Sequence, residues 1–417
     1  WLTEKIQIST RSQVELGSFK RDGSDMFIES FLSKGYEDAA YAETKVDAIR
    51  AELGWIKNKA FQIPEVTISQ AKVVFSDDRL KRLSDEPAPS TDEVVVVEKK
   101  GAPSFIRRFL PEKVEVGEIR VGSAVIESFS SDGELEFAVR GTQASVDPDF
   151  ENKSYVVNAS GGKLIVAGVP EVKIQSVDLT AKGKSIFIND GDFKVYGDGH
   201  VDADGEIILE EKTELDLNVE FSDIDLTEVI GGEWKERIEG KARGNAKVTG
   251  TTDSLMQKGH LVVDDALLQT VPFLEKVADF TDTERFNRLT LNQCEADFER
   301  TSELVKLTNI QLQSDGLLRI EGNIDIAADR AIDGMFQLGI SSRLADKLPF
   351  VKDLVFKTQR DGFNWTPMKI GGTLDDPQNS LVDLMKNLWE NAQILEQGKG
   401  LLEGLLKGVT GGNQGGE

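Results

Sequence analysis

Residues 214–221 read ELDLNVEF and alternate strictly between polar and apolar side chains. Leu215, Leu217, Val219 and Phe221 fall on one side of an extended chain, and the acidic and amide side chains fall on the other. A period of two is typical of a β-strand with one dry face and one wet face. Because the pattern recurs along most of the chain, the sequence predicts a mainly β protein.

Turn sequences separate many of the alternating segments. An Asx-Gly pair supplies the positive φ that a tight hairpin needs, so consecutive strands should be antiparallel neighbours in a long meander. The predicted turns are Asn189-Asp190-Gly191, Asp198-Gly199, Asp204-Gly205, Ser314-Asp315-Gly316 and Asp361-Gly362.

The apolar face of such a meander has to be covered. Two sheets can pack together, one sheet can close into a filled barrel, or helices can cover the face. The predicted helices are too few to cover so many strands, while periodicity leaves the barrel and the sandwich open. A further solution is a sheet whose apolar face is covered by lipid. We therefore predict a long antiparallel meander curled into an elongated open groove, with a few short amphipathic helices.

The candidate groove-lining side chains are apolar residues on the dry side of the alternating segments. They are Val172, Ile174, Ile186, Ile188, Leu215, Leu217, Val219, Phe221, Val305, Leu307, Ile310, Leu312, Leu318, Ile320, Phe336 and Leu338.

The chain divides into segments of different composition. Residues 1–81 form a predicted N-terminal β-groove unit, and residues 82–104, rich in proline, serine and acids, a flexible linker or insert. Residues 105–376 form the predicted main groove, with short helices near 268–280 and 344–356. Apolar residues at helical spacing predict a C-terminal amphipathic helix over 377–410, followed by a disordered tail at 411–417.

The net charge of −24 limits the classes of binding partner that the chain can have. Nucleic-acid binding requires a basic surface, and so does electrostatic adhesion to an anionic membrane; the acidic balance argues against both. No apolar run reaches the roughly 18 residues of a membrane span. Because the sequence begins with Trp1 rather than Met, we expect a fragment from which a signal or anchor has been removed.

Few residues have the chemistry of a catalytic or metal site. Cys294, the single cysteine, continues an alternating run and is predicted to be a small buried hydrophobe. His200 and His260, the two histidines, lie far apart in sequence and do not form a triad or a zinc set with other residues. We therefore predict no catalytic residues, no metal and no cofactor.

One segment has nearly the spacing of a calcium-binding loop. His200 stands where the first acidic ligand belongs, and strands rather than helices flank the segment. We interpret it as a hairpin turn. The residues are His200, Asp202, Asp204, Gly205, Ile207 and Glu211.

Three segments carry a resemblance to a family. MKIGGTLDDPQ at 368–378 resembles the terminal signature of the AsmA-like family, and residues 244–326 follow the family's order of strand, short helix and strands. Residues 41–75 resemble its N-terminal unit, which follows a membrane anchor. The resemblance implies a repeating β-groove protein in the periplasm of a diderm bacterium, anchored in the inner membrane. It also implies a link to phospholipid transport and to the outer membrane.

Two functions follow as expectations. The first is a non-enzymatic lipid-transfer protein that shields acyl chains of phospholipid or a related lipid in its groove and contributes to outer-membrane lipid homeostasis. Its expected partners are lipid, the inner membrane through an anchor absent from this fragment, and other envelope proteins, but not nucleic acid. The alternative is a structural or assembly scaffold of the envelope with a self-filled β core.

Overall fold

The structure is a computed structural model. It describes residue 7 and residues 12–36, 41–57, 60–75, 113–129, 133–166, 170–209, 212–251, 254–271, 274–275, 278, 283–347 and 349–381. Strands make up most of these residues, and the helices among them are short. The prediction of a mainly β chain is confirmed.

The chain divides into two compact units. Unit 1 consists of residues 1–224 and 245–255, and unit 2 of residues 225–244 and 256–417. This division differs from the predicted one, which placed a boundary at the linker of residues 82–104. The strands on the two sides of that segment pair directly with each other in unit 1.

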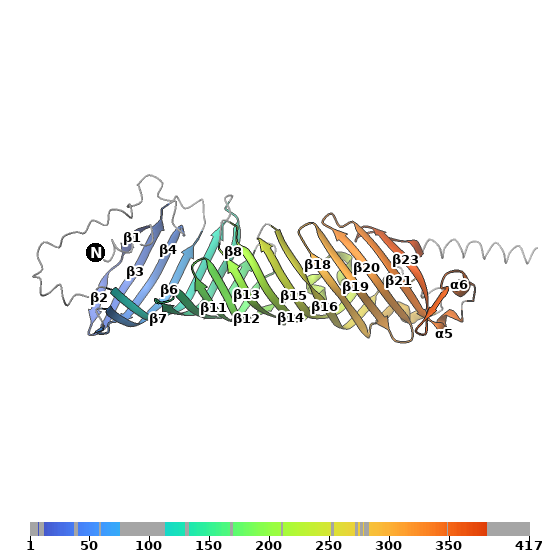
Figure 1. Cartoon of the computed structure of the whole chain (residues 1–417), viewed down its shortest axis with the longest axis horizontal. Helices are drawn as coiled ribbons and strands as arrows, with labels where there is room; N and C mark the ends of the chain where they lie inside the picture. Colours follow the sequence, from blue (N-terminus) through green and yellow to red (C-terminus); the bar gives the residue numbers. More distant parts are fainter. Residues whose placement is uncertain are drawn as a thin grey trace, which may run out of the picture. The chain divides into compact units, whose positions relative to one another are not determined.

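Unit 1 contains an extended run of neighbouring strands (Figure 1). The strands are β1 (Ser12–Leu16), β2 (Phe19–Asp22), β3 (Asp25–Gly35), β4 (Glu43–Glu52), β5 (Ile56–Lys57), β6 (Ala60–Val74), β7 (Lys113–Phe129), β8 (Leu135–Asp149), β9 (Ser154–Ser160), β10 (Lys163–Val166), β11 (Val172–Lys182), β12 (Ser185–Val195), β13 (Gly199–Ile208) and β14 (Glu214–Asp225). Apart from β6 with β7, the neighbouring strands within β1–β14 are antiparallel, and most of the pairs join strands that follow each other in sequence.

The exception to the antiparallel rule is the pair β6 and β7. These strands run parallel, with Ala60 opposite Lys113 and Val74 opposite Glu127. A parallel pair needs a long crossover, because the chain must return to the end where it started. Residues 75–112 make that connection, so the sheet of unit 1 is mixed.

A carboxylate ties the parallel pair together. Glu127 on β7 is 7% exposed and accepts from Lys72 at 2.9 Å and from Arg140 at 2.8 Å. Lys72 lies on β6 and Arg140 on β8, so the three charges join three adjacent strands. Burial by itself raises the pKa of Glu127, but the two cationic donors outweigh burial and hold its pKa below the ordinary value.

Unit 2 is also built from antiparallel neighbours. β15 (Ile238–Thr251) and β16 (Ser254–Gln269) contribute residues to both units. The further strands are β17 (Arg288–Thr290), β18 (Gln293–Arg300), β19 (Leu304–Ser314), β20 (Leu318–Ala327), β21 (Ile332–Ser341), β22 (Thr358–Arg360), β23 (Phe363–Gly372) and β24 (Pro377–Asn379).

Short helical segments accompany the strands of unit 2. Asp225 caps α3 by accepting from the backbone N–H of Thr227, and Pro349 opens α6, where its missing N–H costs no helical bond. The segments are α3 (Leu226–Val229), the 3₁₀ helices η1 (Gly232–Glu236) and η2 (Glu284–Phe286), α5 (Ser342–Ala345) and α6 (Pro349–Leu354). Figure 1 shows α5 and α6 beside the ends of β21 and β23.

Three of the five predicted hairpin turns are confirmed. Residues 196–198 connect β12 to β13, with Gly199 already the first residue of β13, residues 315–317 connect β19 to β20, and Asp361-Gly362 connects β22 to β23. Asp361 and Gly362 both have positive φ, as a two-residue hairpin with the favoured twist requires.

The other two predicted turns are wrong. Asn189, Asp190 and Gly191 lie inside β12, where the register against β13 shifts between Ile188 and Gly191. The polar pair therefore forms a β-bulge and not a reversal. Gly205 lies inside β13 with φ +137, so the residues predicted as a turn around it are strand.

The predicted helices are shorter than expected. Leu268 and Gln269 still belong to β16, and of residues 270–280 only Leu274, Glu275 and Ala278 are described as helical. The predicted helix at 344–356 is two helices, α5 and α6. The predicted C-terminal helix over 377–410 begins with the strand β24, and its residues after 381 lie outside the described residues, as do the linker 82–104 and the tail 411–417.

Candidate functional site

The eight groove-lining residues predicted in unit 1 share one face of its sheet. Leu217 lies opposite Gly205, which lies opposite Ile188, and Ile188 lies opposite Leu179. Val172, Ile174, Ile186, Leu215, Val219 and Phe221 fall in neighbouring rows of the same face, because they are an even number of residues away along their strands or pair across them.

Register pairs extend this face far beyond the predicted residues. Two cross-strand rows, here called the apolar rows, run through β6, β7, β8, β9, β11, β12, β13 and β14. The first row is Val66, Ile119, Val146, Val157, Leu179, Ile188, Gly205 and Leu217; the second is Ile68, Val121, Ala144, Ala159, Val177, Gly191, Ala203 and Val219. Every member is a hydrocarbon side chain or glycine, so the face is apolar from β6 to β14.

The apolar rows are only partly shielded from solvent. Apart from Gly191, each of their members is partly exposed rather than buried, and so are seven of the eight predicted residues; Ile174 is buried. Between Ser12 and Ile224, the described residues contain no helix that packs over this face. An apolar face that stays partly exposed releases free energy when hydrocarbon covers it.

Small residues interrupt the larger ones within the rows. Gly205 has no room for a side chain, since an added Cβ would lie 2.1 Å from the Asp216 carbonyl oxygen. Gly191 stands across from Ala203, in the row of Val219. The sequence reading missed these glycines as parts of the face because it assigned them to turns.

The eight lining residues predicted in unit 2 have different surroundings. Ile310, Leu318, Ile320, Phe336 and Leu338 are buried in one hydrophobic cluster, and Leu318 and Leu338 are 0% exposed. Leu307 and Leu312 pack against that cluster, and Val305 is partly exposed. The five buried positions have no open apolar surface to offer a ligand.

Helical residues close the apolar face of unit 2. Leu344 and Ala345 of α5 belong to the same cluster, as do Val355 and Phe356 after α6 and Leu274 and Ala278 before η2. A polar clasp holds one of these segments in place. The buried Asn364 donates to the Phe356 carbonyl at 3.3 Å and accepts from Ser342 at 2.9 Å.

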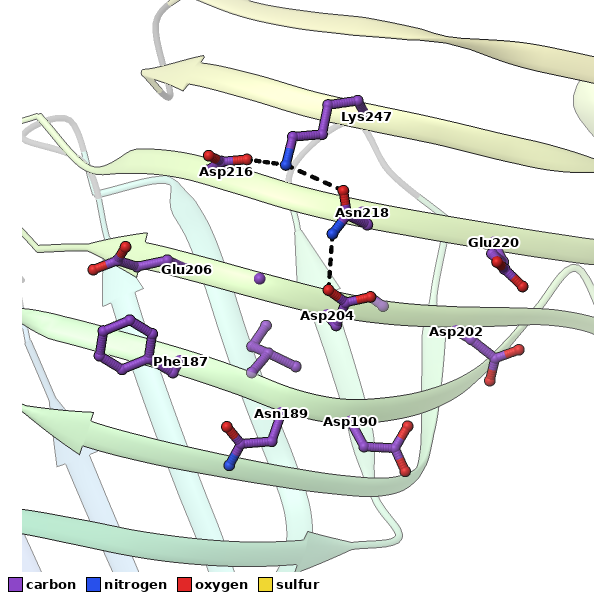
Figure 2. A pocket seen from close by; sticks show the side chains of 13 residues that line it. Phe187, Asn189, Asp190, Asp202, Asp204, Glu206, Asp216, Asn218, Glu220 and Lys247 are labelled. Atoms are coloured by element: carbon purple, nitrogen blue, oxygen red, sulfur yellow. Dashed lines mark hydrogen bonds and ion pairs between the residues drawn. The ribbon is translucent and has the colours of Figure 1, made fainter.

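The polar face of unit 1 carries an acidic depression of about 650 Å³ over β12 to β15. Figure 2 shows its side chains: Lys247 pairs with Asp216 and donates to Asn218 at 3.1 Å, and Asn218 donates to Asp204 at 2.8 Å. Asp190, Asp202, Glu206 and Glu220 add further negative charge, and Phe187 adds an aromatic ring.

The segment with calcium-loop spacing is divided between the two faces, with His200, Asp202 and Asp204 on the polar face and Gly205 and Ile207 on the apolar face. His200, Asp202 and Asp204 are alternate residues of β13, so it is neither the hairpin turn of our interpretation nor a loop that wraps an ion. Glu211 lies outside the described residues. Among the residues that the structure describes, no group of three or more histidine, cysteine or acidic side chains has an arrangement that could hold a metal ion.

Among the described residues of unit 2, Cys294 and His260 have separate surroundings. Cys294 is partly buried, and burial raises the pKa of its thiol to about 11, so the thiol stays protonated at neutral pH. His260 contacts Asp297 at 2.8 Å, and Asn309 donates to the other carboxylate oxygen at 2.7 Å. Both hydrogen bonds hold the pKa of Asp297 below its ordinary value, and the bond from Asn309 has the larger effect.

None of the helices in the described part of the chain is both long and apolar enough to cross a membrane. Comparison of the chain with protein-family models, with curated proteins and with solved structures found no significant match.

Proposed function

We propose that the chain is a lipid-binding protein whose unit 1 shields acyl chains of phospholipid, or of a related lipid, on its apolar face. The observation that supports this most is the pair of apolar rows, which cross eight strands and remain partly exposed. Moving one CH₂ group out of water contributes about 0.8 kcal/mol, so an acyl chain of roughly fifteen carbons contributes about 12 kcal/mol. That is enough to keep a lipid on the face without any chemical step.

The apolar face has no polar side chain in its two rows that could select a headgroup. Specificity for the hydrocarbon and tolerance of the headgroup follow from this composition. The small residues Gly191, Ala203 and Gly205 leave shallow positions along the rows, and we expect the acyl chain to lie across them.

The experiment is extraction of the purified protein with organic solvent, followed by mass spectrometry of the extract. We expect co-purified phospholipid. Leu217→Asp and Val219→Asp, separately and together, should lose lipid while the protein stays folded. A carboxylate on the partly exposed rows stays hydrated in the lipid-free protein, but an acyl chain that covered it would have to remove its water.

The control is Glu220→Lys, which places a new charge on the same strand but on the opposite face, across from Asp202. It should keep its lipid. Two results together would contradict the proposal: the folded wild-type protein yields no lipid on extraction, and it does not bind added phospholipid.

A second candidate function has an observation in its favour. The closed core of unit 2, with Leu318 and Leu338 fully buried, is what a structural or assembly scaffold with a self-filled core would show. If Leu217→Asp unfolds unit 1 as a core substitution does, and no lipid is extracted, the scaffold is the better account of the whole chain.

We extend the proposal to the site of action, which is the periplasm of a diderm bacterium, at its inner membrane. This address and a role in outer-membrane lipid homeostasis rest on the resemblance of segments such as MKIGGTLDDPQ to the AsmA-like family. Fractionation of cells that produce the protein tests it, and recovery of the protein in the cytoplasmic fraction contradicts it.

A further inference from the structure

One set of strand ends in unit 1 lies along a common edge. Glu52 at the end of β4 is opposite Asp25 at the start of β3, and Asp149 at the end of β8 is opposite Ser154 at the start of β9. Lys182 at the end of β11 is opposite both Ser154 and Ser185. These pairs bring the connections at residues 22–25, 53–55, 149–154, 182–185 and 208–209 to one edge of the sheet, here called the turn rim.

Large apolar side chains on the turn rim are exposed. Trp55 is 88% exposed, the highest value among the large apolar side chains of the described residues. Phe150 is 51% exposed and Leu209 is 44% exposed. Exposing each of these apolar side chains to water costs free energy, and in the described part of unit 1 neither a helix nor a strand covers them.

The backbone holds Trp55 in this exposed position. Gly54 donates to the Gln62 carbonyl at 2.9 Å, and Gln62 donates to the Trp55 carbonyl at 3.2 Å. The turn therefore continues the ladder of β5 and β6, whose register places Ile56 opposite Phe61. A hydrogen-bonded backbone that already presents an indole ring to solvent loses less entropy when a partner buries the ring than an unpaired loop would.

Exposed lysines stand between the apolar side chains of the rim. Lys153 lies in the β8–β9 turn, and Lys182 and Lys184 flank the β11–β12 turn next to Leu209, whose N–H donates to the Lys184 carbonyl at 2.8 Å. The rim also carries the acids Asp22, Asp25, Asp149 and Glu151. The Asp149 carboxylate accepts from Asn152 and from the backbone N–H of Glu151, and these bonds, together with the charge of Lys182, lower its pKa.

This combination fits a bilayer surface better than a protein pocket. Tryptophan places an apolar ring and a polar N–H at the level of the lipid headgroups, and lysine reaches the phosphates while its stem stays in the apolar layer. The rim residues are spread along strand ends from β4 to β13, whereas hot spots of a protein interface cluster at its centre.

We propose that the turn rim docks unit 1 on a phospholipid bilayer, with Trp55, Phe150 and Leu209 inserted at the headgroup level and Lys153 and Lys182 on lipid phosphates. This inference rests on the proposed function and deepens it. Docking by the rim brings the partly exposed apolar rows of the same sheet to the membrane from which a lipid would be taken up.

The test is flotation of the full chain with vesicles of phosphatidylcholine, a lipid without net charge. We expect the wild-type protein to float with the vesicles, and Trp55→Ala to lower the partition coefficient about tenfold, the factor that 1.4 kcal/mol produces. The matched control is Phe187→Ala, because Phe187 is 38% exposed but lies on the polar face of β12. It should float like the wild type.

Fluorescence gives a second readout that a folding defect would not imitate. Brominated phosphatidylcholine should quench the wild-type protein more than Trp55→Phe, which keeps an apolar ring and should still float. Equal quenching of the two proteins, or equal flotation of the wild type and Trp55→Ala, overturns the docking proposal.

Binding of a fluorescent fatty acid in the absence of vesicles separates this inference from the proposed function. If the wild-type protein binds the fatty acid but does not float, docking is wrong and the proposed function stands. If it floats through Trp55 but does not bind the fatty acid, docking stands and the proposed function fails.

Discussion

Leu338 in unit 2 and Leu217 in unit 1 occupy the same kind of position, the dry side of an alternating strand. Leu338 is 0% exposed and packs in a cluster with side chains from α5 and from the segment after α6. Leu217 stays partly exposed beside Gly205. The strand pattern sets which face is apolar, and the connections between strands set whether that face is closed.

The lengths of the connections explain the difference. In unit 2, residues 342–357 between β21 and β22 and residues 270–287 between β16 and β17 supply helical residues that reach the cluster. In unit 1, the described connections from β8 to β13 are short turns such as Gly183-Lys184. Short turns carry no side chains that could cover a neighbouring sheet face.

The largest expected effect comes from placing a charge in each unit. We expect Leu338→Asp to destabilise unit 2 by more than about 4 kcal/mol, because an unpaired carboxylate would be buried. Leu217→Asp should cost about 1 kcal/mol or less, since its carboxylate stays hydrated. Hydrogen exchange followed by mass spectrometry measures both units separately. Equal loss of protection in the two variants would remove the distinction between an open and a closed face.

A substitution with a smaller expected effect tests whether every position on the apolar face of unit 1 tolerates a change of side chain. We expect Gly205→Ala to cost about 1–3 kcal/mol, because the new Cβ would meet the Asp216 carbonyl and φ is +137. Chemical denaturation measures the cost. Gly231→Ala is the matched control, since a Cβ there meets no atom within 4 Å and its φ is −97. If both substitutions are neutral, the close approach of β13 and β14 at Gly205 is not required.

The smallest effect concerns the ion triad on the parallel pair. Glu127→Gln should lower the stability of unit 1 by about 1–2 kcal/mol at pH 7, since Lys72 and Arg140 are about half exposed and regain hydration. The pKa of Glu127 is lower in the folded state than its ordinary 4.5, so the contribution is present above that pH and is lost as the pH falls through the folded pKa.

Denaturation of the wild type and of Glu127→Gln at several pH values checks this sign. The difference between them should shrink as the solution becomes acidic. Glu214→Gln, at an exposed strand end, is the control and should show a much smaller difference at neutral pH. A difference that grows at low pH would contradict the triad as the cause.

Alternation alone predicted which residues share a face. Leu215, Leu217, Val219 and Phe221 lie on one side of β14, as ELDLNVEF indicates. The same alternation could not show that Leu318 and Leu338 are covered, because the covering residues such as Phe356 come from other parts of the chain. The local pattern of polar and apolar residues predicts which face of a strand is apolar. It does not predict which distant residues cover that face.

The sequence also could not predict which distant strands pair, because the alternation is a local pattern. Val66 and Ile119 are neighbours in the first apolar row, although 52 residues lie between them in the sequence. Asx-Gly pairs were also ambiguous, since Asp361-Gly362 reverses the chain while Asp190-Gly191 forms a bulge. The reversal uses a positive φ at both residues, whereas neither Asp190 nor Gly191 has a positive φ in the bulge, and the dipeptide alone does not distinguish the two outcomes.

The parallel seam between β6 and β7 also has a consequence for the order of folding events. Strands on either side of it meet their neighbours through short reversals, which close quickly and at low entropic cost. Closing the connection of residues 75–112 costs about 2 kcal/mol more than closing a four-residue hairpin. We therefore expect β1–β6 and β7–β14 to fold first, each as a separate group of strands. The pairing of β6 with β7, where Glu127 contacts Lys72 and Arg140, should then be the late, rate-limiting step in the folding of unit 1.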